Sequence, residues 1–365
     1  MLMEIDKLPT ILDVVEMISE LENKQILLDV SSVPSSPYFD EGRFNFVSDR
    51  NNRMVVHLMP TSQSPFTFYR GQSHYYEPCI PSLYRVETGC DKLTAEDIAV
   101  RRIKICEFVR LLNAHSVYAE VSQNILLHPV ALAQHYGLAT EYLDITNSKW
   151  VAAFFASTGY DWETDEYYPV GRDYGDGYGV MYISKDLHKV ASLDSFFERN
   201  DVIGYQYFER PSKQSSFGYR MEKGEDFNSN RFFDKIFFRH DLEASSIVFE
   251  MSYRQERFIP RDTLSKLARI ILTSQEATLG ALELCMRIFY SEMQDYDSLI
   301  KACDKKGVKI KKDNVPITQY PLDEIEAEWK SWNEYGRADI NSRILPIRPI
   351  ISIPIPDSDY GHSKD

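Results

Sequence analysis

The sequence predicts an α+β fold, in which a mixed or mostly antiparallel sheet carries packed helices and a helical C-terminal extension follows. Two observations lead to this prediction. Segments with helical and with strand character both occur, but long connections separate the strands and strictly alternating βα units are absent. The 365 residues are 43% hydrophobic and 26% charged, which is a globular composition with enough length for more than one domain.

Composition also limits the partners and the compartment. The net charge of −14 argues against broad nucleic-acid binding, because a phosphate surface would be repelled. The five cysteines are odd in number and form no CxxC pair, which fits reduced thiols better than a disulfide framework. The start of the chain lacks the layout of a signal peptide, and no apolar run approaches the length of a membrane span. We therefore expect a cytoplasmic protein without a membrane partner.

Residues 1–64 are predicted to be an N-terminal elaboration that packs on the main domain. Residues 10–22 have the periodicity of an amphipathic helix, and residues 25–30 read as a short strand. Residues 31–52 are rich in Ser, Pro, Asp and Asn and predict a loop, before a strand over residues 53–59. The apolar stripe of the helix consists of Ile11, Val14, Val15, Ile18 and Leu21.

The main domain is predicted over residues 65–290, and it opens on the stretch Phe68–Gln72. Arginine offers a planar fork of donors that suits carboxylate or phosphate, so Arg70 is a candidate ligand-binding residue. Gly71 allows another backbone or a ligand to come close. Two interpretations of Arg70 stay open: it binds a ligand, or it forms a buried ion pair with Asp144.

The next elements are helical. A long helix begins at Thr94 with acidic residues in its first turn, where the helix dipole favours them. A shorter helix follows His128, with Pro129 near its start and Gly137 as its stop signal. The stripe of the long helix includes Ile98, Ile105, Phe108, Val109 and Leu112, at the spacing of a core-facing helix.

Polar residues then occur beside a deeply buried segment. A strand or turn over residues 142–145 precedes an almost wholly apolar helix at 150–156, which must be buried nearly all round. Gln134, His135 and Asp144 therefore lie near a core, where polar groups need partners or a ligand. His135 is either a satisfied core histidine or an acid–base group, since an ordinary histidine titrates near neutrality. Asp144 would then orient His135 or Arg70.

The combined motifs resemble the FRG domain, a bacterial and phage module named for its Phe-Arg-Gly sequence. The resemblance depends on the order of the motifs over roughly residues 65–290, because Tyr-Arg-Gly alone carries no weight. The matching stretches are Tyr69–Gln72, His135–Leu138 with Thr140, Leu143–Thr146, Ala152–Ala156, Asp176–Ile183, Gln214–Phe217, and Leu264–Thr273 as a closing strand and helix.

This resemblance implies one composite pocket. Its ligand-binding residues would be Arg70, Gly71, Gln72, Asp144 and Thr146, and its catalytic residues His135 and Gln214. The order of the motifs is also distantly similar to the ADP-ribosyltransferase fold, in which an early-strand residue binds NAD and a late Glu or Gln contacts the ribose. Arg70 and Gln214 would fill those two roles. NAD is accordingly the candidate cofactor.

Two classes of function follow from the resemblance. The first is an enzyme that binds a nucleotide-like small molecule and performs NAD-dependent ADP-ribosyl transfer or NAD hydrolysis. The alternative is a non-catalytic sensing or interaction module in a bacterial stress or phage response. No metal site is predicted, because the histidines are scattered and lack ligand spacing.

Residues 291–365 are predicted to form a C-terminal extension. Before it, residues 278–290 read as a strong helix, and residues 304–312 form a basic, exposed loop or hairpin. Residues 322–332 suggest another helix. Residues 344–356 alternate Pro and Ile, which excludes a regular helix and suggests an extended arm. This arm would pack on another subunit of a homo-oligomer or wrap around its own chain.

Overall fold

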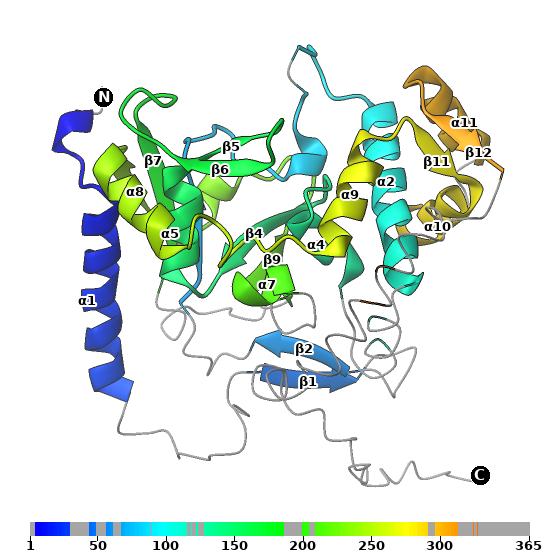
Figure 1. Cartoon of the computed structure of the whole chain (residues 1–365). Helices are drawn as coiled ribbons and strands as arrows, with labels where there is room; N and C mark the ends of the chain where they lie inside the picture. The colour runs from blue at the N-terminus through cyan, green and yellow to red at the C-terminus, as the bar shows by residue number, and fades with distance from the viewer. Residues whose placement is uncertain are drawn as a thin grey trace, which may run out of the picture.

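The protein has an α+β fold built around a six-stranded antiparallel sheet, which confirms the predicted α+β class with an antiparallel sheet (Figure 1). The expected distant likeness to the ADP-ribosyltransferase fold stays a prediction. The strand order is β10-β7-β3-β4-β9-β8, so strands far apart in sequence lie side by side. The strands are β3 (Tyr69–Gln72), β4 (Tyr142–Thr146), β7 (Tyr178–Ser184), β8 (Asn200–Val202), β9 (Ser216–Arg220) and β10 (Phe233–Arg239). The computed structural model describes residues 4–29, 44–48, 56–60, 67–87, 89–114, 118, 122, 128–185, 199–203, 209–290, 296–312, 324 and 327.

Three helices cover one face of this sheet (Figure 1). They are α1 (Ile11–Asp29), α5 (Lys149–Ser157) and α8 (Leu242–Met251). Their apolar side chains meet Tyr69, Met181 and Phe238, which point to this face from three neighbouring strands. Ser148 caps α5 by accepting a hydrogen bond from the Val151 amide, and α5 is largely buried, as predicted.

The other face of the sheet carries an aromatic core that loops cover. Phe68, Val180 and Phe217 pack there with side chains from the segments before and after the sheet strands. Phe68 and Phe217 meet edge to face at 5.0 Å between ring centroids. The covering side chains are Cys79, Met221, Phe227 and Phe232. The short 3₁₀ helices are η1 (Ile5–Lys7), η2 (Ser82–Tyr84) and η4 (Phe227–Ser229).

A helical layer packs beside the sheet, where α2, α4 and α9 share one core and α10 and α11 share another with α2 (Figure 1). Both cores form because α2 has buried residues on two sides. All five cysteines are free thiols, and three of them are buried in the second core. The elements are α2 (Ala95–Ala114), α4 (Pro129–His135), α9 (Thr263–Thr273), α10 (Leu279–Phe289) and α11 (Tyr296–Lys305).

Asp97 ties α11 to the start of α2. Its carboxylate accepts hydrogen bonds from the Thr94 amide and hydroxyl and forms an ion pair with Lys306. Burial alone would raise the pKa of Asp97, but the hydrogen bonds and charge of these partners outweigh it and lower the pKa to about 2.

Three two-stranded sheets complete the fold. The β5–β6 hairpin lies above the main sheet in Figure 1, and it borders a cavity beside that sheet. A parallel pair, β11–β12, joins the segment before α10 to the segment after α11. The remaining elements are β1 (Phe44–Ser48), β2 (Val56–Pro60), β5 (Thr158–Asp161), β6 (Glu166–Pro169), α7 (Glu209–Lys213), β11 (Glu276–Thr278) and β12 (Lys309–Lys311). Among the described helices, none has the length and apolar content that would be needed to cross a bilayer.

Several elements differ from the sequence-based expectation. The predicted strand at 25–30 is wrong, because α1 continues to Asp29 with no glycine or proline to stop it. The predicted loop at 31–52 contains strand β1. The expected closing strand at 264–273 is helix α9, since an apolar run at i, i+3, i+4 spacing buries one side of a helix. Leu21, which the prediction placed in the apolar stripe of the helix at residues 10–22, is 54% exposed and does not belong to the buried side of α1.

The C-terminal predictions have mixed outcomes. The helix at 278–290 is confirmed as α10. Residues 304–312 are mostly exposed, as predicted, but they form the end of α11, a turn and strand β12 instead of a loop or hairpin. Of residues 322–332 the structure describes only 324 and 327, and the arm at 344–356 lies outside the described residues. Oligomerisation through that arm stays a prediction.

Candidate functional site

A cavity of ≈ 430 Å³ lies where the sheet meets α4, α7, α9 and the β5–β6 hairpin. Its size is that of small-molecule sites in proteins. Six of the seven residues predicted from the sequence line it, from segments that are separated by up to 144 positions. These are Arg70, Gly71, His135, Asp144, Thr146 and Gln214.

The cavity opens at the seam between β3 and β4, the two central strands. Within these described strands, the pairing register contains a single pair, Tyr69 with Thr146, and the strands diverge from there. Arg70 spans the divergence, because its Nη1 donates a hydrogen bond to the main-chain oxygen of Asp144 at 2.7 Å. Arg70 therefore contacts Asp144 through the backbone, while the Asp144 carboxylate is directed to His135.

Gly71 serves the close approach of two backbones. A Cβ atom at this position would lie 1.8 Å from the carbonyl oxygen of Ala152 in α5. Only glycine allows α5 to lie so near β3. Of the two roles expected for Gly71, contact with a backbone is thus present in the structure.

His135 and Gln214 form a buried pair whose hydrogen bonds fix a tautomer. The Gln214 Nε2 donates to the Phe258 carbonyl at 3.1 Å, so the Gln214 Oε1 faces His135 Nδ1 at 2.8 Å. Because an amide oxygen only accepts, Nδ1 must carry a proton. In neutral His135 the Nε2 atom then holds the lone pair, and it lies 3.5 Å from Asp144 Oδ1. This is the arrangement of a general base whose orientation is fixed by a partner on the opposite nitrogen.

Thr146 and Gln72 have local structural contacts. The Thr146 hydroxyl donates to the Gln214 main-chain oxygen at 2.7 Å and accepts from the Ser148 amide at 3.0 Å. Thr146 thereby joins β4 to the segment that carries Gln214. Gln72 lies outside the cavity lining, and its side chain meets the buried thiol of Cys79 at 3.4 Å.

Three further arginines line the cavity that sequence reasoning did not identify: Arg85, Arg210 and Arg269. Arg85 is half-buried, and its Nε donates to the Ile80 carbonyl at 2.9 Å. Burial, and after it the like charge of Arg70, lower the pKa of Arg85. The two guanidinium groups therefore disfavour each other's charge, which an anion between them would relieve.

Four polar atoms of the wall are buried and make no hydrogen bond within the described part of the chain. They are Arg70 Nε, Arg210 Nε, His135 Nε2 and Asp144 Oδ1. Buried polar atoms are almost always paired in folded proteins, and exceptions concentrate where function requires them. Their gathering in one cavity distinguishes this cavity from ordinary core packing.

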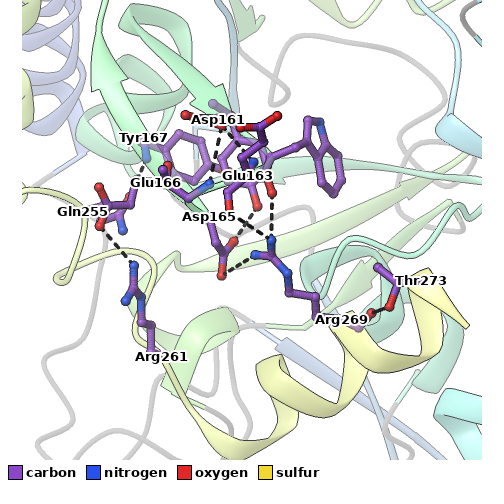
Figure 2. Close-up of polar contacts among 12 residues, drawn as sticks. Asp161, Glu163, Asp165, Glu166, Tyr167, Gln255, Arg261, Arg269 and Thr273 are labelled. Carbon is purple, nitrogen blue, oxygen red and sulfur yellow. Dashed lines mark hydrogen bonds and ion pairs between the residues drawn. The ribbon is translucent and has the colours of Figure 1, made fainter.

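The β5–β6 hairpin supplies an aromatic wall opposite these groups. Tyr160, Trp162 and Tyr167 line the cavity from the hairpin, and Phe155 lines it from α5. Burial raises the pKa of Tyr167 to about 12, so its hydroxyl is neutral at physiological pH. Figure 2 shows Arg269 of α9 directed at the hairpin, where it pairs with Asp165 at 3.3 Å.

A left-handed turn at Tyr253, Arg254 and Gln255 supports both walls. These residues have φ angles of 52°, 51° and 75°, which non-glycine residues rarely adopt. The Gln255 Oε1 accepts the Tyr167 amide at 2.7 Å, and the Gln255 carbonyl accepts the Phe258 amide at 2.9 Å. Because the Phe258 carbonyl orients Gln214, one strained turn positions the hairpin and the His135 pair together.

Comparison with known proteins agrees with the motifs. Residues 66–164 match the family model of the FRG domain. This range contains Arg70, His135, Asp144 and the tip of the hairpin, but it ends before Gln214. No curated protein and no solved structure gives a significant match. Within the described residues, no group of three or more His, Cys, Asp or Glu side chains could hold a metal ion.

Proposed function

We propose that the cavity of this FRG-domain protein, whose family match covers residues 66–164, binds an anionic, nucleotide-like ligand on which His135 acts as an acid–base group. NAD is the ligand that we propose first, with ADP-ribosyl transfer or NAD hydrolysis as the reaction. The observation that carries the proposal is that Arg70 and Arg85, whose like charges repel, line the same cavity as His135, whose tautomer is fixed by a hydrogen bond.

The charge of the cavity supports an anionic ligand. Four arginines line it against two carboxylates, Asp144 and Asp165, although the whole chain has a net charge of −14. Arg269 is paired with Asp165, which leaves the guanidinium groups of Arg70, Arg85 and Arg210 in the cavity lining. Guanidinium groups bind phosphate in a bidentate manner, and a diphosphate would satisfy the buried Nε atoms of Arg70 and Arg210.

The proposed chemistry uses the His135 Nε2 atom. As the bond between nicotinamide and ribose breaks, this atom would accept the proton of the attacking water or acceptor hydroxyl. Asp144 would stabilise the imidazolium that forms, because its Oδ1 lies 3.5 Å away. Both ends of the Gln214 amide are engaged, with His135 and with the Phe258 carbonyl. We therefore assign Gln214 a positioning role in place of the direct ribose contact expected from the distant ADP-ribosyltransferase likeness.

The second candidate is a non-catalytic sensing module in a bacterial stress or phage response. The burial of His135 favours it, because only 2% of the side chain is exposed and Asp144 covers its Nε2 atom. In that case the same arginines would bind the nucleotide. A rearrangement at the seam between β3 and β4, caused by binding, would then signal to a partner that the nucleotide is present.

Calorimetric titration with NAD, ADP and pyrophosphate tests ligand binding, and chromatographic detection of released nicotinamide tests turnover. We expect Arg70→Gln to lower the affinity for all three ligands at least tenfold, because it removes one charge-assisted hydrogen bond worth about 1.5–3 kcal/mol. Arg287→Gln removes an exposed positive charge from α10, outside the cavity, and is the matched control.

The variants of His135 separate the two candidates. An enzyme loses nicotinamide release in His135→Gln while NAD still binds. Binding of NAD without turnover by the wild type, also in the presence of candidate acceptor proteins, favours the sensing module. The proposal as a whole is refuted if the folded wild type binds none of the three ligands.

A further inference from the structure

Resting on the proposed anion site, we infer that the β5–β6 hairpin forms a second subsite, in which Trp162 stacks on a planar heterocycle of the same ligand. The nucleotide-like ligand of the proposed function is then specified as one that contains a nucleoside diphosphate, bound in two parts. Its phosphates lie at Arg70 and Arg85, and its base lies at the hairpin.

The exposure of Trp162 is the first argument. Trp162 is 67% exposed although it lines the cavity, whereas tryptophan is normally highly buried. Tyr160 contacts it at 5.0 Å between ring centroids in a T-shaped arrangement, which leaves much of the indole surface uncovered. An uncovered indole at the mouth of a cavity is a surface on which a flat, apolar ring can pack.

The second argument is that the hairpin tip is held in place. Arg269 Nη2 donates to the Trp162 main-chain oxygen at 2.7 Å, and Arg269 Nη1 pairs with Asp165 at 3.3 Å. The Tyr160 hydroxyl also donates to Asp165, which fixes the two strands at the turn. Figure 2 shows these contacts converging on the turn between β5 and β6. Because the main chain of the tip is already held, only the Trp162 side chain has to be ordered when a ligand binds, which lowers the entropy cost of the contact.

The start of β6, directly after the tip, is fixed as well. Arg261 pairs with Glu166 at 3.3 Å, and Gln255 accepts the Tyr167 amide (Figure 2). These contacts come from the segment between α8 and α9, so the tip half of the hairpin is attached to the part of the chain that leads into α9 and Arg269. Trp162 and the anion site thus belong to one rigid cavity.

The third argument is the division of the cavity into two chemical ends. Arg70 spans the divergence of β3 and β4 and Arg85 is near enough to feel its charge, whereas Tyr160, Trp162 and Phe155 line the cavity from the hairpin and α5. A phosphate alone would use the first end and leave Tyr160, Trp162 and Phe155 without a role. A nucleoside diphosphate has both chemistries, joined by a ribose.

The test compares ADP with pyrophosphate by isothermal titration calorimetry on the full chain. We expect the wild type to bind ADP more tightly than pyrophosphate, and Trp162→Ala to reduce this preference about tenfold without changing the pyrophosphate affinity. Trp162→Phe should retain most of the preference. Tyr168→Ala is the matched control, because Tyr168 is a 44% exposed aromatic of the same hairpin that does not line the cavity.

The outcomes distinguish failure of the stacking subsite from failure of the anion site. If Trp162→Ala and Tyr168→Ala lower the ADP preference equally, or neither lowers it, the stacking subsite is refuted while pyrophosphate binding leaves the anion site standing. If the folded wild type binds neither compound, both the anion site and the subsite are refuted. Far-UV circular dichroism confirms that each variant is folded, which the exposure of Trp162 leads us to expect.

Discussion

Replacing Gly71 by alanine tests the central packing of the fold. The added Cβ would lie 1.8 Å from the Ala152 carbonyl oxygen and 2.7 Å from its carbonyl carbon, whereas ordinary contact begins at 3.4 Å. Helix α5 would have to retreat from β3 by roughly 1.6 Å. Ala153 and Phe154 of α5 are fully buried, so the helix cannot move without displacing its other neighbours.

We expect Gly71→Ala to lower the free energy of unfolding by about 3 kcal/mol or more, at the upper end of overpacking costs. Gly307→Ala is the control, because no atom lies within 4 Å of the added Cβ; its φ of +69° adds a backbone strain that Gly71, whose φ is not positive, does not have. The control should lose only about 1 kcal/mol, from backbone strain. Urea unfolding followed by circular dichroism measures both variants. A loss in Gly71→Ala no larger than in the control would refute the close approach of β3 and α5.

Three further predictions concern the site and its supports. Gln214→Ala should leave His135 without its Nδ1 partner, so ¹⁵N NMR should show mixed ring tautomers; a single Nδ1–H form would contradict the role of Gln214. Tyr253→Gly should raise the free energy of unfolding by about 1 kcal/mol by relieving a left-handed φ. Gln255→Gly relieves the same strain but loses a buried hydrogen bond worth about 1–3 kcal/mol, so it should not gain stability; equal gains in urea unfolding would exclude the supporting role of the turn. The pKa of Asp97, about 2, lies below its ordinary 3.8, so its contribution to stability is complete above about pH 4 and is lost as the pH falls to about 2. The stability difference between wild type and Asp97→Asn should accordingly shrink over that range, and a difference independent of pH would oppose this assignment.

The order of the motifs that resemble the FRG domain predicted one pocket for Arg70, His135, Asp144 and Gln214, and all four line the cavity. Arg70 and Asp144 lie within the two strands of the seam, His135 is the last residue of α4, and Gln214 directly follows α7. Gln72, which the same motifs group with them, lies outside the cavity. Two residues along a strand advance the side chain by about 6.6 Å, which carries Gln72 past the cavity to Cys79.

The remaining part of the site depends on tertiary contacts without a local signal. Arg85 follows a 3₁₀ turn, and Arg210 lies in a five-residue helix, so neither has a periodicity that marks it. Trp162 reads in sequence as an ordinary turn residue, and its place in the cavity follows from the way Arg269 holds the hairpin. The strand predictions at 25–30 and 264–273 failed for another reason: short apolar runs are compatible with helix and strand alike.

The seam between β3 and β4 divides the sheet into two halves, β10-β7-β3 and β4-β9-β8. Within the sheet, the halves are joined by the residue pair Tyr69–Thr146 and by the Arg70 hydrogen bond to Asp144. Arg70 is therefore at once a part of the cavity and a connection between the halves. Thermodynamic linkage would make this dual position reciprocal: the proposed anion, by holding Arg70 across the seam, would strengthen the association of the halves, and any contact elsewhere that tightens the halves would strengthen anion binding by the same factor. Under the proposed function, the association of the two halves and the binding of the anion would thus be coupled through a single guanidinium group.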